Sequence, residues 1–179
     1  PYSAFVVNPS FEDGSIGQIA RNQWLNEWRL GGSKTNESDG TFAYIQSSDV
    51  HDGDGSNALS VTSTDPGGFW NIRVFNTSYA FDGDGTNSID ATVSFWAKTT
   101  DPGSDQIYGN YSGDMRILLK DTGPLGAATS NGQFDKNTRV ELVTDTWVYV
   151  TKTLTFPAAD QYNLALYLEF GELDGTTII

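Results

Sequence analysis

The chain has 179 residues, the usual size of one domain, and its hydrophobic share of 37% is enough for one core. Its formal charge of −13, from 23 acidic and 10 basic residues, makes nucleic acid and anionic membranes poor partners, because both repel such a surface. The absence of cysteine excludes disulfides, zinc–thiolate clusters and thiol nucleophiles, and no apolar run approaches the roughly 20 residues that span a bilayer.

The ends of the sequence suggest a piece of a larger protein. The chain begins at Pro1 without a methionine or a signal peptide, which is typical of an excised domain or a mature fragment. Its end, residues 175–179, resembles a strand cut off midway. We therefore expect residues 1–179 to be a single domain whose last strand is truncated.

The first patterned segment, between Ile16 and Leu30, suggests a helical turn. Ile16, Ala20, Trp24 and Trp28 recur there at intervals of four, which is typical of one face of a helix. We expect one short helix or helical turn at this point, as a minor addition to the fold.

Further along, short alternating segments follow one another, separated by turns rich in Gly, Asn and Asp. In 89–98, for example, Ile89, Val93 and Ala97 fall on one face, with Thr92 and Lys98 on the other. Such period-two alternation indicates strands with one face on a core. The segments with this character are 58–61, 71–75, 89–98, 115–120, 147–156 and 163–170.

These segments predict an all-β fold, an antiparallel β-sandwich of the jelly-roll type. Strands of a jelly roll tend to alternate between its two sheets. On that basis one sheet contains the segments 70–75, 115–120 and 163–170, and the other contains the segments 58–61, 89–98 and 147–155.

Five segments, in the same order, resemble carbohydrate-binding modules of families 4, 9, 16 and 22. They are NPSFEDG at 8–14, DGSNALSV at 54–61, WNIRV at 70–74, VSFWAK at 93–98 and TWVYV at 146–150. The resemblance implies a jelly roll whose concave sheet holds a glycan chain, with a structural calcium ion at the sandwich edge, away from the sugar. Aromatic rings stack on the apolar faces of sugars, while planar polar groups bind the hydroxyls.

The family resemblance places the glycan on the sheet that contains 70–75. Carried over by position, Trp70 is a stacking platform, Arg73 binds hydroxyls, and Tyr167 and Glu169 lie across the cleft. The family more often has Gln or Glu where Arg73 stands, which suggests a different sugar, an anionic one among the options. The full set of expected carbohydrate-binding residues is Trp70, Asn71, Arg73, Arg116, Tyr167, Glu169 and Trp28.

Structural roles for the same residues remain open alternatives. Trp70 near a strand start can be a packing residue, and Arg73 can be a surface ion-pair partner. Trp96 and Trp147 match positions that are structural in the family, so we leave them out of the site.

The family's calcium site implies four ligands in this chain: the main-chain oxygens of Ser10 and Asn57 and the carboxylates of Glu12 and Asp54. Such an oxygen set suits a hard cation. A further family ligand, an aspartate in the last strand, would follow Ile179. Residues 52–55 can alternatively be a simple tight turn.

The residue types give little support to catalysis. His51, the only histidine, lies in an Asp-rich segment and is expected to be a solvated loop residue, so a catalytic triad is not expected. Residues 169–174 are the only dense carboxylate group, and they straddle the end of a predicted strand, where side chains diverge.

We therefore expect a non-catalytic, secreted polysaccharide-binding module, a monomer within a multidomain glycoside hydrolase or polysaccharide lyase. The alternative is a structural or adhesion module of a cell-surface protein, without a sugar site. Cellulose, xylan, mannan, β-1,3-glucan, alginate and agar are all compatible ligands. The Gly-rich segments 103–113 and 123–132 can leave the cleft open or close its ends.

Overall fold

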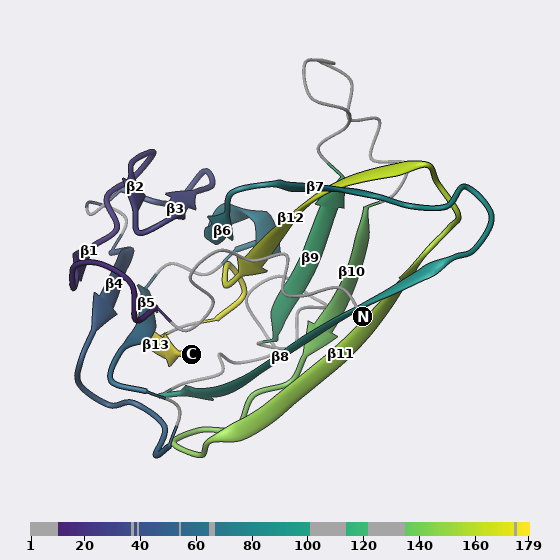
Figure 1. Ribbon diagram of the computed structural model, residues 1–179. Helices are drawn as coiled ribbons and strands as arrows, with labels where there is room; N and C mark the ends of the chain where they lie inside the picture. The colour runs from purple at the N-terminus through teal and green to yellow at the C-terminus, as the bar shows by residue number, and fades with distance from the viewer. Residues whose placement is uncertain are drawn as a thin grey trace.

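The computed structural model describes residues 11–36, 38, 40–53, 55–64, 67–100, 114–121, 135–173 and 175–179. Within these ranges the chain folds into two antiparallel sheets joined by turns and loops (Figure 1). The described residues include no helix long and apolar enough to cross a membrane. The two Gly-rich segments expected to flank the cleft lie outside the described residues.

One sheet has six strands in the order β1-β4-β5-β13-β8-β11. Its strands are β1 (Gly17–Gln18), β4 (Phe42–Gln46), β5 (Ala58–Ser63), β13 (Gly175–Ile178), β8 (Ile89–Thr99) and β11 (Val148–Phe156). The other sheet has seven strands, in the order β10-β9-β12-β6-β3-β2, with β7 also paired to β12. Its strands are β10 (Lys136–Val140), β9 (Met115–Asp121), β12 (Gln161–Glu169), β6 (Arg73–Asn76), β3 (Trp28–Gly31), β2 (Trp24–Leu25) and β7 (Tyr79–Asp82).

The predicted sandwich and its division into sheets are confirmed. Strands β6, β9 and β12 share the seven-stranded sheet, while β5, β8 and β11 share the six-stranded one. The long strands β8 and β11 run side by side over nine paired residues (Figure 1). On their outer face, cross-strand hydroxyl pairs such as Thr92–Thr153 at 2.9 Å join the two strands.

The core lies between the sheets and is built from the apolar members of each alternating strand. Leu59 and Val61 of β5 face Ile117 of β9 and Leu164 and Leu168 of β12 across this core, and all five are buried. Because alternate residues point to opposite faces, the residues between them face outward. This alternation decides which side chains of β12 are available to a site.

The expected helical turn between Ile16 and Leu30 is wrong. The chain instead forms a hairpin of β2 and β3, in which Leu25 pairs with Trp28 across the two-residue loop Asn26–Glu27. Both loop residues have positive φ, 49° and 72°, which is the geometry that suits the right-handed twist of paired strands. Asn26 also anchors the loop, because its Nδ2 donates a 2.7 Å hydrogen bond to the carbonyl oxygen of Ser15.

Several strands carry no period-two signal in the sequence. Strand β10 is polar apart from Val140, and it lies at an edge of the seven-stranded sheet, where polar residues protect an unpaired backbone. Strands β4 and β7 are only five and four residues long. Pairing with long neighbours, β5 and β12, defines them as strands.

Candidate functional site

The outer face of the seven-stranded sheet carries two rows of side chains that run across its strands. In the first row, Trp24, Arg29, Phe75 and Tyr167 are directly opposite one another on β2, β3, β6 and β12. Adjacent strands are about 4.8 Å apart, so the row from β2 to β9 spans roughly 19 Å. Lys120 of β9 completes it diagonally, because Tyr167 pairs with Leu118, two residues earlier.

The rings of the first row pack against one another. Phe75 and Tyr167 are stacked with centroids 4.6 Å apart and planes at 9°, and Trp24 meets Phe75 edge-on at 5.8 Å. Because the stacked pair comes from adjacent strands, each ring covers one face of the other. Only Trp24, 49% exposed, offers solvent a large part of its ring.

Cations occupy the remaining ring faces of this row. The guanidinium carbon of Arg29 is 5.7 Å from the Trp24 ring centre and 5.8 Å from that of Phe75. Lys120 Nζ is 5.8 Å from the Tyr167 ring centre, and the guanidinium carbon of Arg73 is 5.9 Å from it. The row is therefore an array of cations separated by aromatic rings. Burial raises the pKa of the Tyr167 hydroxyl above its usual range, so this side chain stays neutral at physiological pH.

The second row is charged, and Glu169 is its centre. Glu169 lies between Arg73 of β6 and Arg116 of β9 and is fully buried. Its Oε1 is 2.9 Å from Arg73 Nε, and its Oε2 accepts a hydrogen bond from Arg116 Nε. A buried carboxylate requires such pairing, and here one carboxylate orients two guanidinium groups.

Arg139 of β10 extends the second row, directly opposite Arg116. Phe69 is buried beneath both, with its ring centre 4.8 Å from the Arg116 guanidinium carbon and 4.9 Å from that of Arg139. Asp114 Oδ2 is 3.7 Å from Arg139 Nη1. The aromatic ring and the carboxylate together hold two like charges side by side.

Glu172, in the turn after β12, is 4% exposed, and neither of its carboxylate oxygens has a hydrogen-bond partner among the described residues. Burial raises its pKa to about 7, an effect that Asp114 adds to and that Arg139 and Arg116 oppose. At neutral pH this carboxyl is therefore protonated in a large fraction of molecules.

The sequence pattern placed Trp70 in a strand, but it lies in a 3-10 turn, Phe69–Asn71, that leads into β6. The Gly68 carbonyl accepts the Asn71 N–H at 2.9 Å, which closes the turn. A Cβ atom on Gly68 would lie 2.8 Å from the Trp70 ring, so glycine is required there for the indole to fold back. The indole is 50% exposed, whereas the Asn71 amide is partly engaged, with its Oδ1 accepting a 2.8 Å hydrogen bond from Ser33 Oγ.

The prediction that Trp28 contacts the glycan is contradicted. Trp28 is 2% exposed and packs in the core against Phe11, with ring centres 5.0 Å apart. The β2–β3 hairpin is the cause, since it sends Trp24 outward and Trp28 inward, whereas a helix would have placed both on one face. The other expected residues, Trp70, Asn71, Arg73, Arg116, Tyr167 and Glu169, lie in or beside the two rows. Glu169 is fully buried against its two arginines, and the contact of the other five with a ligand stays a prediction.

Sequence reasoning missed Arg29, Phe75, Lys120 and Arg139. A signal was present for Phe75 and Lys120, because each lies two or four residues from a predicted site residue on an alternating strand. Arg29 was hidden by the helical interpretation of its segment. Arg139 lies on a strand without alternation, so only the sheet pairing locates it.

Two of the four expected calcium ligands, Ser10 and Asp54, lie outside the described residues. The other two are brought together: Glu12 Oε1 accepts hydrogen bonds from the main-chain N–H groups of Ser56 at 2.7 Å and Asn57 at 2.8 Å. Asn57 Nδ2 also donates to the Phe11 carbonyl oxygen at 3.0 Å. One carboxylate oxygen is thus already satisfied, which leaves Oε2 as the atom that would contact a cation. The described residues contain no group of three or more His, Asp or Glu side chains suited to a metal, so the calcium site stays a prediction.

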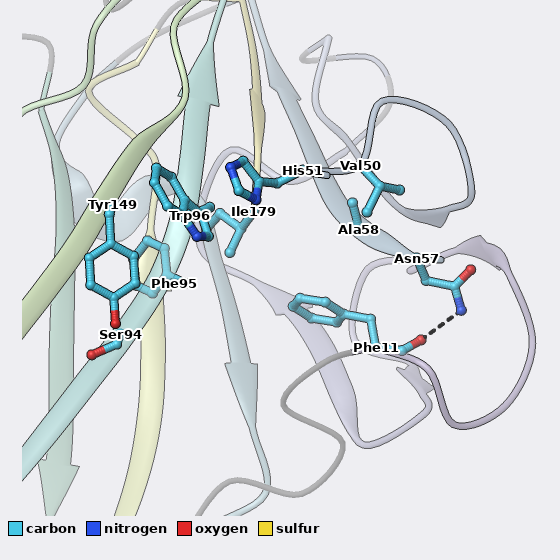
Figure 2. Close-up of a pocket in the computed structure, with 10 residues that line it drawn as sticks. All are labelled: Phe11, Val50, His51, Asn57, Ala58, Ser94, Phe95, Trp96, Tyr149 and Ile179. Atoms are coloured by element: carbon cyan, nitrogen blue, oxygen red, sulfur yellow. Dashed lines mark hydrogen bonds between the residues drawn. The ribbon is translucent and has the colours of Figure 1, made fainter. Parts of the chain in front are cut away.

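A pocket of about 370 Å³ lies on the side of the six-stranded sheet (Figure 2). His51 is not a freely solvated loop residue as expected, because its ring stacks on Trp96 at 4.0 Å. Tyr149, 54% exposed, is 5.2 Å from the Trp96 ring, and Phe11 lies across the pocket from both (Figure 2). This pocket is on the sheet opposite the two rows, so a substitution in it can test which sheet holds a ligand.

Comparison with known proteins gives a likeness of fold. No family model matches the chain, and neither does any curated protein. Among solved structures, a family 4 carbohydrate-binding module is 22% identical, with a TM-score of 0.51 over 97% of this chain and 93% of that one. A xylan-binding domain, CBM22-2, from Paenibacillus barcinonensis is 13% identical, with a TM-score of 0.51 over 92% and 93% of the two chains.

The same fold also occurs within a protein of another kind. The enzymatically active domain of tailspike protein 4 of bacteriophage CBA120 is 11% identical, with a TM-score of 0.53 over 85% of this chain but only 18% of that one. The chain thus has the jelly-roll fold of carbohydrate-binding modules, as the five sequence segments suggested, while the fold by itself leaves the function to be argued from the site.

Proposed function

We propose that the protein is a non-catalytic, extracellular polysaccharide-binding module that holds an attached glycan-degrading enzyme on its substrate, and that the glycan lies across the outer face of the seven-stranded sheet. The family 4 module and the xylan-binding domain share its fold over nearly their whole lengths, which supports sugar binding in a general sense. We propose that a calcium ion supports the fold at Glu12 and Asp54, away from this face.

The observation that carries the proposal is the pair of rows on one sheet face. Half-exposed Trp24 and Trp70 offer ring surface for the apolar faces of sugars, while Arg73 and Arg116 offer oriented N–H donors for their oxygens. This mixture of aromatic and planar polar groups is what a sugar-binding surface requires. Because Trp24, Arg73 and Arg116 come from strands of one sheet, their spacing is held rigidly, and Trp70 lies in the turn that leads into β6.

The catalytic alternative has little support on this face. Glu169 is fully buried and paired with two arginines, so it is placed to orient them and not to transfer protons. Glu172 lies in a turn, and the nearest charged groups acting on its pKa are Arg139, Asp114 and Arg116. A glycosidase instead needs two carboxylates that flank one bond of the substrate.

The test is affinity electrophoresis of the chain through gels that contain soluble xylan, β-glucan, mannan, alginate or agar. The double variant Trp70→Ala/Arg73→Ala is run beside the wild type, together with Tyr149→Ala in the opposite sheet. We expect one glycan to retard the wild type and Tyr149→Ala equally, and to retard the double variant much less.

Three results would contradict parts of the proposal. If no gel retards the wild type, a structural or adhesion module becomes the better interpretation. If Tyr149→Ala alone loses retardation, the ligand lies in the pocket of the six-stranded sheet. Release of reducing ends or unsaturated products from any of the glycans would show an enzyme.

A further inference from the structure

The basic residues of this acidic chain are unevenly distributed. Of the 10 basic residues, five project from the outer face of the seven-stranded sheet, although the chain carries a formal charge of −13. They are Arg29, Arg73, Arg116, Lys120 and Arg139. Half of the cations of an acidic chain therefore lie on one sheet face.

The two central arginines keep hydrogen-bond donors free for a ligand. Arg116 donates its Nε–H to Glu169, while Arg73 Nε lies 2.9 Å from Glu169 Oε1 as an ion pair without an aligned hydrogen bond. Their terminal Nη groups make no hydrogen bond within the described residues, and the side chains are 28% and 20% exposed. Two parallel N–H groups on a fixed guanidinium match the oxygens of a carboxylate or a sulfate, and they bind an anion more strongly than a neutral hydroxyl.

Arg116 and Arg139 form a cross-strand pair of like charges. They are directly opposite in the β9–β10 register, and like charges in that position destabilise a sheet. Asp114 is 3.7 Å from Arg139 and Glu169 contacts Arg116, and the two guanidinium groups share the Phe69 ring. An anion between them would remove the repulsion that remains.

Arg29 lies between Trp24 and Phe75 in the aromatic row and Lys120 lies at its β9 end, and within the described part of the chain neither forms an ion pair. Arg29 donates only a long hydrogen bond to Asn22, 3.3 Å, and its Nε is buried without an acceptor. Both cations lie against rings of the row, which blocks the faces of Phe75 and Tyr167 that a neutral sugar would stack on. A ligand that follows this row therefore meets cations at intervals, with ring edges between them.

The carboxylates near the two rows do not cancel this charge. Glu169 is shared by two arginines, Asp114 is beside one, and Glu172 is protonated in a large fraction of molecules at neutral pH. Asp135 is close enough to Tyr167 to raise the pKa of the Tyr167 hydroxyl, and it directly precedes Lys136 at the start of β10. At physiological salt, charges more than about 8 Å away are screened, so a bound chain is affected mainly by these local groups.

We propose that the face binds an acidic polysaccharide, through carboxylate or sulfate groups carried at regular intervals on its sugar rings. The inference rests on the proposed glycan-binding function and adds the chemical class of the glycan. The repeating acid groups would meet Arg29, the Arg73–Arg116 pair and Lys120 in turn along or across the rows.

The experiment is isothermal titration calorimetry of the full chain with matched acidic and neutral glycans in 0.15 M salt. The acidic probes are oligogalacturonate, oligoalginate and a sulfated galactan, and the neutral partners are carboxyl-reduced uronate oligomers, the desulfated galactan, xylan and β-glucan oligomers. The variants are Arg29→Gln and Lys120→Gln, and the matched control is Lys152→Gln on β11 of the opposite sheet. Melting temperatures of all variants are measured first.

We expect at least one acidic probe to bind about tenfold or more tightly than its neutral partner, because a hydrogen bond to a charged group contributes that much. We expect Arg29→Gln and Lys120→Gln each to weaken that binding several-fold, and Lys152→Gln to leave it unchanged. Binding of uronates alone, or of the sulfated galactan alone, identifies which acid group the face accepts.

Two results overturn the inference in distinguishable ways. If neutral glycans bind as tightly as acidic ones, the face accepts sugars without regard to charge, and the proposed function stands while the inference fails. If neither acidic nor neutral glycans bind, the proposed function fails, and the inference fails with it. The wild-type comparison of matched probes decides this even if a variant does not fold.

Discussion

The buried carboxylate of Glu169 holds the second row together, and its replacement by glutamine is the sharpest structural test. Glu169→Gln keeps the shape of the side chain but removes the charge that pairs with Arg73 and Arg116. Gln retains one acceptor oxygen for the Arg116 Nε–H, but the two guanidinium groups remain close together without the charge of Glu169.

The size of the effect follows from burial. Removing one partner of a fully buried ion pair costs about 3–5 kcal/mol. Here the carboxylate is fully buried, but the arginines are 28% and 20% exposed and can regain some water. We therefore expect a loss of about 2–3 kcal/mol in the free energy of unfolding, which is about 5–10 °C in melting temperature for a chain of this size.

The assay is calorimetric or circular-dichroism melting of Glu169→Gln beside wild type and beside Glu141→Gln, a matched substitution at an exposed position. Retardation by the bound glycan should also fall, since both guanidinium groups lose their orientation. A melting temperature within about 1 °C of that of the Glu141→Gln control would refute the reasoning, because a surface substitution has an effect of that size.

Three further outcomes are expected. The folded-state pKa of Glu172, about 7, is above its usual 4.5, so between these pH values the folded state holds a proton that the unfolded state releases. The free energy of unfolding should therefore fall by at most about 3 kcal/mol as pH rises from about 4.5 to about 7. Glu172→Gln should abolish that fall in urea unfolding measured across this pH range. Trp28→Ala should cost about 3–5 kcal/mol in urea unfolding, because it empties part of the core, whereas Trp24→Ala should cost less than about 1 kcal/mol but weaken glycan retardation. Calcium should raise the melting temperature without changing glycan affinity, and identical melting curves with calcium and with chelator would contradict the calcium proposal.

Much of the fold could be predicted because strand alternation is local. Residues such as Leu164 and Leu168 carry the period-two signal within one segment, so the strand and its buried face follow from adjacent positions. The alternation of strands between two sheets then assigned β6, β9 and β12 to one sheet correctly. The Trp24–Trp28 spacing misled the prediction, because recurrence at four residues is also compatible with a hairpin whose loop reverses the chain.

The sequence by itself determined the all-β class, the main strands and the candidate residues that face outward with Tyr167, since these depend on neighbours one or two positions away. Only the tertiary structure decided that Arg73, Glu169, Arg116 and Arg139 form one row, because they come from four strands and meet through cross-strand pairing. The same holds for Trp28, whose burial is set by hairpin pairing with β2 and by packing against Phe11. Register and inter-sheet packing are non-local interactions, and they place the charges and rings of this face.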